Sequence, residues 1–368
     1  MKDIGLYIHI PFCKKKCYYC DFISYSNKNN LIEKYIDTLI QEYHSYNMDS
    51  NYRIKTIYIG GGTPSFIHSK YIKKILERIN TKNAEEITLE VNPGTVTREK
   101  LQDYYKIGIN RLSIGLQSTD DKILESIGRI HNYTEFLETY NMARKCGFRN
   151  INIDLMLALP EQTIDVLNES LKKVIKLKPE HISLYSLILE EGTILNEKVN
   201  NKEFILPTDE EERKMYWETK QILEKNGYIH YEISNFAKKG YESKHNMDCW
   251  KQKEYIGLGA SAHSYLDGKR YSNQNSIEEY VNDYSNKEIH EIQDKITKEK
   301  EYMILGLRKL KGINISEFKS KFQENPIYIF RKELDKLSKL GLIEIDLNNI
   351  KLTNKGLDLA NIVWKEFI

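Results

Sequence analysis

Short apolar runs alternate with amphipathic stretches along the first 190 residues, and this alternation constrains the fold more than any other feature of the chain. Six runs have the composition of β-strands, at residues 5–10, 56–59, 87–91, 111–116, 151–157 and 181–187. Between them, apolar residues recur at helical spacing, in stretches that include 31–46, 70–80, 98–106, 133–146 and 164–177. Strands that alternate with helices predict a parallel sheet with right-handed crossovers. Six such units predict an incomplete (β/α)6 barrel, with its site at the carboxyl ends of the strands.

The pattern changes beyond residue 190, which predicts three regions. Residues 1–190 form the partial barrel, and residues 191–295 form a segment that closes it. The closing segment holds a charged helix over 208–226, a strand over 228–233 and a polar loop over 245–250. Residues 296–368 read as helices followed by a small hairpin, which predicts a smaller helical, winged-helix-like domain. The hairpin turn at 346–349 is acidic and polar, which favours a structural or docking role over DNA contact.

Three cysteines follow the first strand in a C-x3-C-x2-C arrangement: Cys13, Cys17 and Cys20. Three thiolates on one tight loop can hold three corners of a cubane [4Fe-4S] cluster and leave the fourth iron open. A zinc site would call for a fourth ligand at matching spacing, and a disulfide would leave one thiol over. The spacing therefore predicts a cluster with an open iron.

The amino-acid composition limits the binding partners and the cellular compartment that we expect for this chain. The 55 basic and 53 acidic residues leave a net charge of +2, which gives no electrostatic case for nucleic acid or an anionic membrane surface. Five cysteines, three of them clustered, suit a reducing compartment in which thiolates remain available for metal. The first residues lack a signal-peptide core, and no apolar run approaches the roughly 20 residues of a membrane span. We expect a cytoplasmic protein.

The cysteine loop resembles the opening of radical S-adenosylmethionine (radical SAM) proteins. The closest likeness is to the branch that holds oxygen-independent coproporphyrinogen III oxidase and the heme chaperones of the HemW type. Further motifs follow in the order of that branch, at GGGTP (60–64), EVNP (90–93), SIGLQ (113–117), Arg129, DLMLALP (154–160) and HNMDCW (245–250). The ordered set covers nearly the whole chain and is far more specific than any one motif.

The resemblance implies a SAM site. The methionine amino group of SAM would meet Gly61, Gly62 and Thr63, where glycines let the backbone approach a ligand closely. Carboxylates can accept bonds from ribose hydroxyls, and an arginine can pair with a carboxylate. The positions that the resemblance assigns to the ribose or the methionine carboxylate are Glu90, Gln117, Arg129 and Asp154, with Tyr7, Tyr19 and Ser186 as weaker assignments. If each were considered alone, the glycine segment would be interpreted as a tight turn, and the charged residues would be interpreted as ordinary surface charges at the ends of strands or helices.

Two features separate the branches of this family. The oxidases carry a longer segment before the cluster motif and a further cysteine just after its third cysteine, whereas here Cys13 comes early and Cys20 is followed by Asp21 and Phe22. The pattern Cys-Asp-Phe is typical of the chaperone branch. His245 opens a motif similar to the HNxxYW of that branch, which implies that His245 ligates heme iron. The alternative for His245 is an ordinary hydrogen-bonded histidine of a loop.

Cys249 stands where the family has tyrosine. Its thiol would pack as a small apolar group, act as a second heme ligand or form a thioether. His263, after a glycine-rich segment, is either a further wall of the same cavity or an unrelated histidine.

The sequence therefore predicts a heme chaperone that carries a [4Fe-4S] cluster, SAM and heme and transfers heme to acceptor hemoproteins. The alternative is an oxygen-independent coproporphyrinogen III oxidase, in which SAM supplies a radical for oxidative decarboxylation, so enzyme activity stays open at this point. A third hypothesis is a DNA-binding redox sensor, but the near-neutral net charge of the chain argues against it. We expect no nucleic-acid partner; transient membrane association and the oligomeric state stay open.

Overall fold

Six parallel strands form the centre of the chain, in the order that the sequence predicts. The computed structural model describes residues 1–368, apart from the side chain of residue 49. The strands are β1 (Lys2–Ile10), β2 (Tyr52–Gly61), β3 (Glu86–Val91), β4 (Arg111–Gln117), β5 (Ile151–Leu157) and β6 (His181–Ser186), and neighbours in the chain are neighbours in the sheet. Most of their residues are buried, as in a parallel sheet covered on both faces. This confirms the predicted partial barrel.

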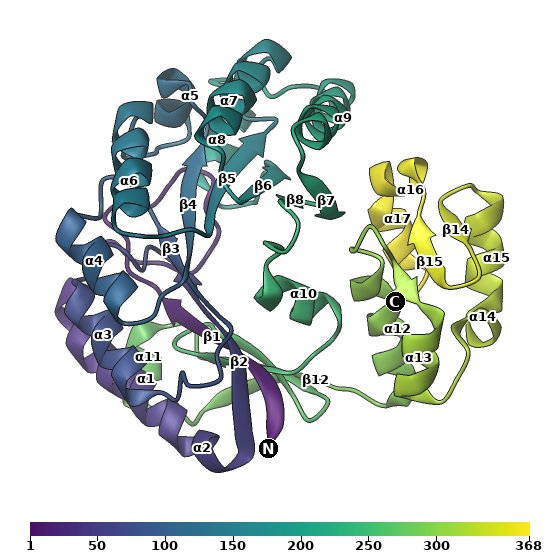
Figure 1. Cartoon of the computed structure of the whole chain (residues 1–368), viewed down its shortest axis with the longest axis horizontal. Helices are drawn as coiled ribbons and strands as arrows, with labels where there is room; N and C mark the ends of the chain where they lie inside the picture. Colours follow the sequence, from purple (N-terminus) through teal and green to yellow (C-terminus); the bar gives the residue numbers. More distant parts are fainter.

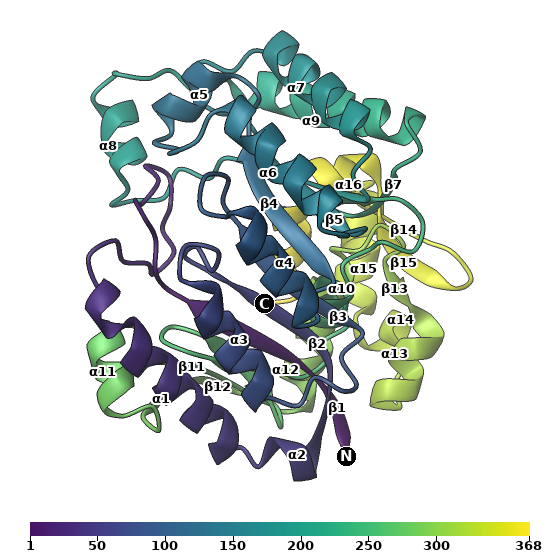
Figure 2. The same ribbon diagram turned by 60° about the vertical axis from the view of Figure 1, so that its left-hand side comes forward.

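Helices between these strands lie along the outer face of the curved sheet (Figures 1 and 2). The long ones are α1 (Ile32–Ser45), α3 (Ser69–Arg78), α4 (Arg98–Lys106), α6 (Tyr133–Lys145) and α7 (Ile164–Leu177), and the short ones are η1 (Asn29–Leu31), α2 (Met48–Asn51) and α5 (Asp121–Ser126). Polar side chains fix where they begin: Thr97, Asn132 and Thr163 each accept a hydrogen bond from a backbone N–H of the first turn. Each long helix buries one apolar stripe in the core.

Further strands extend the sheet to twelve. On one side, β9 (Tyr255–Leu258) pairs parallel with β1, followed by the antiparallel β10 (His263–Leu266), β11 (Lys269–Asn273) and β12 (Lys287–Ile292). On the other side, β8 (Asn235–Ala237) and β7 (Ile229–Glu232) follow β6. Helices α8 (Ile194–Asn200), α9 (Asp209–Lys225) and α11 (Ile277–Asn282) connect these parts. Helix α9 and strand β7 match the expected helix and strand, whereas the strands β9 to β12 were not predicted.

The expected loop over 245–250 is wrong: these residues form helix α10 (Lys244–Trp250). The Ser243 hydroxyl accepts a hydrogen bond from the Asn246 N–H. The Glu86 carboxylate accepts hydrogen bonds from the backbone N–H groups of Lys244 (3.0 Å) and His245 (3.1 Å). An anion at a helix N-terminus satisfies free donors and opposes the helix dipole. The sequence pattern around residues 245–250 did not indicate this helix, because the carboxylate that caps it, Glu86, belongs to a strand far away in the chain.

The C-terminal elements have an apolar core of their own, which includes Met303, Phe318 and Leu337. Their helices are α12 (Lys295–Gly306), α13 (Ile315–Phe322), α14 (Pro326–Ile329), α15 (Arg331–Lys339), α16 (Asn354–Asp358) and α17 (Ala360–Lys365). A small antiparallel sheet joins β13 (Ile313–Asn314), β15 (Asn349–Leu352) and β14 (Ile343–Ile345). The predicted C-terminal helical domain is confirmed, and Figure 1 places it beside the barrel, beyond α10.

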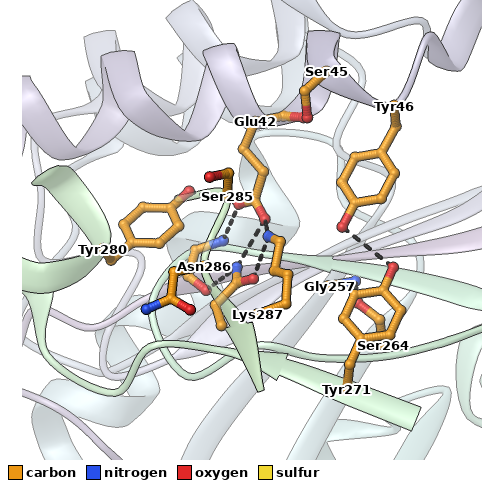
Figure 3. Close-up of polar contacts among 12 residues, drawn as sticks. Glu42, Ser45, Tyr46, Gly257, Ser264, Tyr271, Tyr280, Ser285, Asn286 and Lys287 are labelled. Carbon is orange, nitrogen blue, oxygen red and sulfur yellow. Dashed lines mark hydrogen bonds and ion pairs between the residues drawn. The ribbon is translucent and has the colours of Figure 1, made fainter. Parts of the chain in front are cut away.

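A buried carboxylate ties the added strands to the barrel. Glu42 of α1 is fully buried and accepts hydrogen bonds from the Tyr280 hydroxyl (2.6 Å), the Asn273 amide (2.9 Å) and the Gly259 backbone N–H (3.0 Å). Its carboxylate also pairs with the Lys287 ammonium, as Figure 3 shows. A buried charge is tolerated only when it is paired and hydrogen-bonded in this way. The network therefore fixes the place of β11 and β12 against α1.

We expect Glu42→Ala to lower the free energy of unfolding by about 3–5 kcal/mol, because it leaves a partly buried cation and several buried donors without their acceptor. Urea unfolding of the full chain measures this change. The neighbouring exposed residue supplies the control: Gln41→Ala should change the value by no more than about 0.5 kcal/mol. Equal stabilities of the two variants would contradict this role of the network.

Candidate functional site

The cysteine loop leaves the carboxyl end of β1 and is held by backbone hydrogen bonds. The Cys13 N–H donates to the Tyr25 carbonyl (2.9 Å), and the Tyr25 N–H donates to the Pro11 carbonyl (2.8 Å). Farther along, the Tyr18 N–H donates to the carbonyl of Ile127 (3.0 Å). The loop is therefore attached to both the first strand and the segment after α5.

The GGGTP segment after β2 lies directly against this loop. The N–H groups of Gly62 and Thr63 donate to the carbonyls of Ile10 (3.0 Å) and Phe12 (2.9 Å), and the Thr63 hydroxyl donates to the Cys13 sulfur (3.4 Å). A Cβ on Gly62 would lie 3.0 Å from the Cys13 sulfur. Gly61 has a φ of 110°, a conformation that side chains disfavour. Close approach thus requires glycine at both positions.

One cavity gathers most of the predicted site residues. Its volume is about 450 Å³, and it opens among the carboxyl ends of the parallel strands. Its walls include Cys13, Cys17, Cys20, Tyr19, Gly61, Gly62, Thr63, Glu90, Gln117, Arg129 and Asp154. Two of the residues predicted for SAM lie elsewhere: Tyr7 lines a neighbouring cavity, and Ser186 lines a cavity formed with α9 and α16.

Two half-buried carboxyl groups line this cavity. Glu90 accepts hydrogen bonds from the Tyr58 hydroxyl (2.9 Å) and the Gly61 N–H (3.1 Å), and burial raises its pKa to about 7. Asp154 accepts hydrogen bonds from the Asn152 amide (2.7 Å) and the Ser113 hydroxyl (3.2 Å), and burial raises its pKa also. Each carboxyl thus keeps acceptor capacity in a poorly hydrated wall, which suits recognition of hydroxyl groups.

Arg129 reaches across the cavity from the segment after α5. Its guanidinium donates to the Gly115 carbonyl (2.7 Å), to the Asn92 side-chain oxygen and to the Cys17 sulfur (3.6 Å). Gln117 ends β4 with a φ of 71°, an unusual value for a residue with a side chain, and accepts a hydrogen bond from the Tyr185 hydroxyl (3.2 Å). Such strained conformations often occur at functional sites.

The sequence interpretation missed several polar residues in the walls of this cavity, among them Tyr58, Asn92, Ser113 and Tyr185. Asn92 and Ser113 lie inside the EVNP and SIGLQ motifs, so motif membership could have identified them. Tyr58 lies two residues before Gly60, and Tyr185 lies one residue before the predicted Ser186. For those two, the local sequence carries no signal beyond a position near a strand end.

A second cavity of about 570 Å³ adjoins the first and holds the HNMDCW residues. His245, Asn246, Cys249 and Trp250 line it, and so does His263. Its wall also includes Asp21, Phe22 and Tyr58, and the last two border the first cavity as well. The motif residues of α10 and the cysteine loop therefore face neighbouring spaces.

His245 is 6% exposed and held in one orientation. Its Nδ1 forms a hydrogen bond with the Thr56 hydroxyl (2.9 Å), and its ring lies 5.4 Å from that of Tyr58, centroid to centroid. Burial lowers its pKa to about 4, so the imidazole is neutral at physiological pH. No hydrogen bond to Nε2 is formed by any residue whose side chain the structure describes. A neutral imidazole with one nitrogen fixed and the other free is the usual arrangement of a metal ligand.

Among the described residues, no three His, Cys, Asp or Glu side chains converge where they could share a single metal ion. Cys13, Cys17 and Cys20 all border the first cavity. The described residues also include no helix with the length and apolar character needed to cross a lipid bilayer.

A partial barrel of parallel strands with a three-cysteine loop after its first strand is the architecture of a radical SAM protein. Residues 7–174 match the Radical SAM superfamily, and residues 293–359 match the HemN C-terminal domain. A solved structure of coproporphyrinogen III oxidase (HemN) from Escherichia coli has the same fold, with a TM-score of 0.85 at 24% identity; the match covers 100% of this chain and 90% of that one.

Curated relatives identify the family within this superfamily. The heme chaperone HemW of Lactococcus lactis is 37% identical over 373 residues, which cover 100% of this chain and 98% of the relative. The heme chaperone HemW of Bacillus subtilis is also 37% identical over 373 residues, at 98% coverage of both chains. The chain belongs to the HemW family of radical SAM proteins.

We expect Cys13→Ala, Cys17→Ala and Cys20→Ala each to abolish stable cluster assembly, because loss of one thiolate leaves an iron corner without a protein ligand. Iron and sulfide per chain after anaerobic reconstitution measure this. Cys146→Ala is the matched control, since Cys146 directly follows α6 and lies outside both cavities, and it should retain the full iron content. A triple variant of the loop that binds as much iron as this control would contradict the assignment.

SAM binding should weaken as the pH falls through about 7. The pKa of Glu90 is raised to about 7 by burial, so below that pH its carboxyl takes up a proton and loses an acceptor for a ribose hydroxyl. The dissociation constant should rise by up to about tenfold per pH unit below 7. Glu90→Gln should bind SAM more weakly and with little pH dependence between 6 and 8. An unchanged pH profile in that variant would exclude Glu90 as the responsible group.

Proposed function

We propose that the chain binds heme through His245 and delivers it to acceptor hemoproteins, with a [4Fe-4S] cluster and SAM held in the adjoining cavity. Relatives that are 37% identical to this chain over nearly its full length are named heme chaperones. The observation that carries the proposal is the state of His245, which is buried, neutral, fixed through Nδ1 and part of the wall of a cavity.

The first cavity suits the cluster and SAM. Cys13, Cys17 and Cys20 would each hold one iron, and the Thr63 hydroxyl and Arg129 would donate hydrogen bonds to two of the sulfurs. When bound, SAM on the open iron supplies either a structural seal or a source of radicals. Glu90 and Asp154 would accept hydrogen bonds from the ribose, and Gly61 and Gly62 keep the backbone free of side chains beside the methionine moiety.

The second cavity suits a flat, largely apolar ring with an axial ligand. Phe22, Trp250 and Tyr7 supply apolar and aromatic walls, and His245 supplies the imidazole. Cys249 lies one helical turn after His245 and borders the same cavity, as does His263, so either side chain could supply a second ligand to heme iron. Burial raises the pKa of Cys249 to about 12, which favours the thiol over the thiolate and supports a packing role for this residue.

The residues that distinguish the two branches lie at this cavity. Asp21 and Phe22, which stand in place of the further cysteine of the oxidase branch, both line it. The likeness to the HemN structure concerns the fold and is shared by both branches. The chaperone function is favoured because the sequence departs from the oxidases at the walls that would contact a porphyrin.

Heme affinity tests the proposal. We expect His245→Ala to weaken heme binding at least about tenfold, a loss of roughly 1.4 kcal/mol or more, because the iron loses its axial ligand. Titration followed at the Soret band measures this on the reconstituted full chain. His44→Ala removes an exposed histidine of α1 and should bind heme as the unaltered chain does. Thr56→Val keeps the imidazole but removes its hydrogen-bond partner, so it should give an intermediate affinity.

Unchanged heme affinity in His245→Ala would rule out this ligand. Anaerobic incubation of the reconstituted chain with SAM, a reductant and coproporphyrinogen III addresses the alternative activity. Stoichiometric formation of protoporphyrinogen would overturn the chaperone proposal in favour of the oxidase. We expect none.

A further inference from the structure

A third cavity, of about 830 Å³, lies between the barrel and the C-terminal elements. Residues from the amino-terminal ends of the first barrel strands, from α10 and from the segment after α12 form its walls. It contains none of the predicted cofactor residues. Nothing in the proposed heme or SAM chemistry uses this space.

A buried lysine faces this cavity without a partner. Lys309 is only 6% exposed, and its ammonium makes no hydrogen bond or ion pair with any residue whose side chain is described. Glu317 attracts it from beyond ion-pair distance, and burial lowers its pKa. An ammonium group with so little access to solvent and no acceptor is stabilised when an anion approaches it.

Other lysines around the cavity divide into paired and unpaired groups. Lys55 and Lys244 are both bound to Glu85, and Lys253 is bound to Asp248. Three more line the cavity without any such partner among the described side chains: Lys239, Lys251 and Lys311. With Lys309, four cations face a space in which Glu242 and Glu317 are the acidic residues not already paired. The cavity therefore carries an excess of positive charge.

The remaining walls suit an organic molecule. Ile229, Tyr231 and Met247 provide apolar surface, and Asn314 and Asn349 provide amide groups. The volume falls within the range of small-molecule sites, which combine apolar walls with a few fixed polar groups. Lysine binds phosphate and clustered carboxylates as a mobile point charge.

We propose that this cavity binds a small organic molecule carrying a multivalent oxyanion, either a phosphate group or clustered carboxylates, with Lys309 as its central cation. The site is separate from the heme and SAM cavities but shares α10 with the heme cavity, since Met247 and His245 belong to the same helix. Thr56, the partner of His245, also lines it. A bound anion would thus touch the structure that holds the proposed heme ligand.

Calorimetric titration of the full reconstituted chain with inorganic pyrophosphate, and separately with citrate, tests the site. We expect saturable binding of at least one probe at moderate ionic strength, and at least tenfold weaker binding in Lys309→Met. Stronger binding of pyrophosphate identifies a phosphate ligand, and stronger binding of citrate identifies a carboxylate ligand. Lys332→Met, an exposed position on α15, is the control and should bind as the unaltered chain does.

Thermal unfolding separates binding from folding. Because the ammonium of Lys309 lacks a partner without ligand, Lys309→Met should have the same melting temperature as the unaltered chain, or a higher one, in the absence of the probes. The stabilisation of the unaltered chain by the bound probe should be lost in this variant. Absence of saturable binding by both probes, or equal binding by the unaltered chain and Lys309→Met, would overturn the proposal.

Discussion

The parallel pairing of β1 with β2 on one side and β9 on the other is the constraint on which the site depends. Strands that run in the same direction end at the same edge of the sheet, so the cysteine loop and the GGGTP segment emerge together. Backbone hydrogen bonds from Gly62 and Thr63 to the residues just before Cys13 then fix their separation. Because no side chain intervenes at Gly61 or Gly62, the two segments are close enough to share one ligand site.

Helix α10 links the site to the rest of the molecule. Glu86, at the start of β3, caps its N-terminus, and the Thr56 hydroxyl of β2 forms a hydrogen bond with His245 of the helix. At its other end, Trp250 packs against the Arg308 guanidinium, 4.4 Å from the ring centroid, and Arg308 also lies 5.1 Å from the Trp364 ring of the C-terminal elements. The helix therefore stands between the barrel and the C-terminal unit, with a cavity on each side.

The barrel could be predicted because its signals are local: apolar strands, periodic helices and turn residues repeat in a fixed order. The cysteine loop and most of the cavity residues followed from ordered motifs, and the structure brings them together at one edge of the sheet. Helix α10 could not be predicted in the same way, since its capping carboxylate, Glu86, lies far away in the sequence. The places of β11 and β12 likewise depend on Glu42, whose partners come from segments more than two hundred residues distant. Long-range electrostatic contacts leave no periodic signal in a single sequence.

The central claim is that one chain holds a cluster and a heme in adjoining cavities, with His245 as the heme ligand. An anaerobic crystal structure of the reconstituted chain with SAM and heme tests it most directly. We predict a cluster bound by Cys13, Cys17 and Cys20, SAM on its fourth iron, and heme iron coordinated by Nε2 of His245. Heme iron bound by a residue outside the second cavity, or a fourth protein ligand on the cluster, would contradict this account.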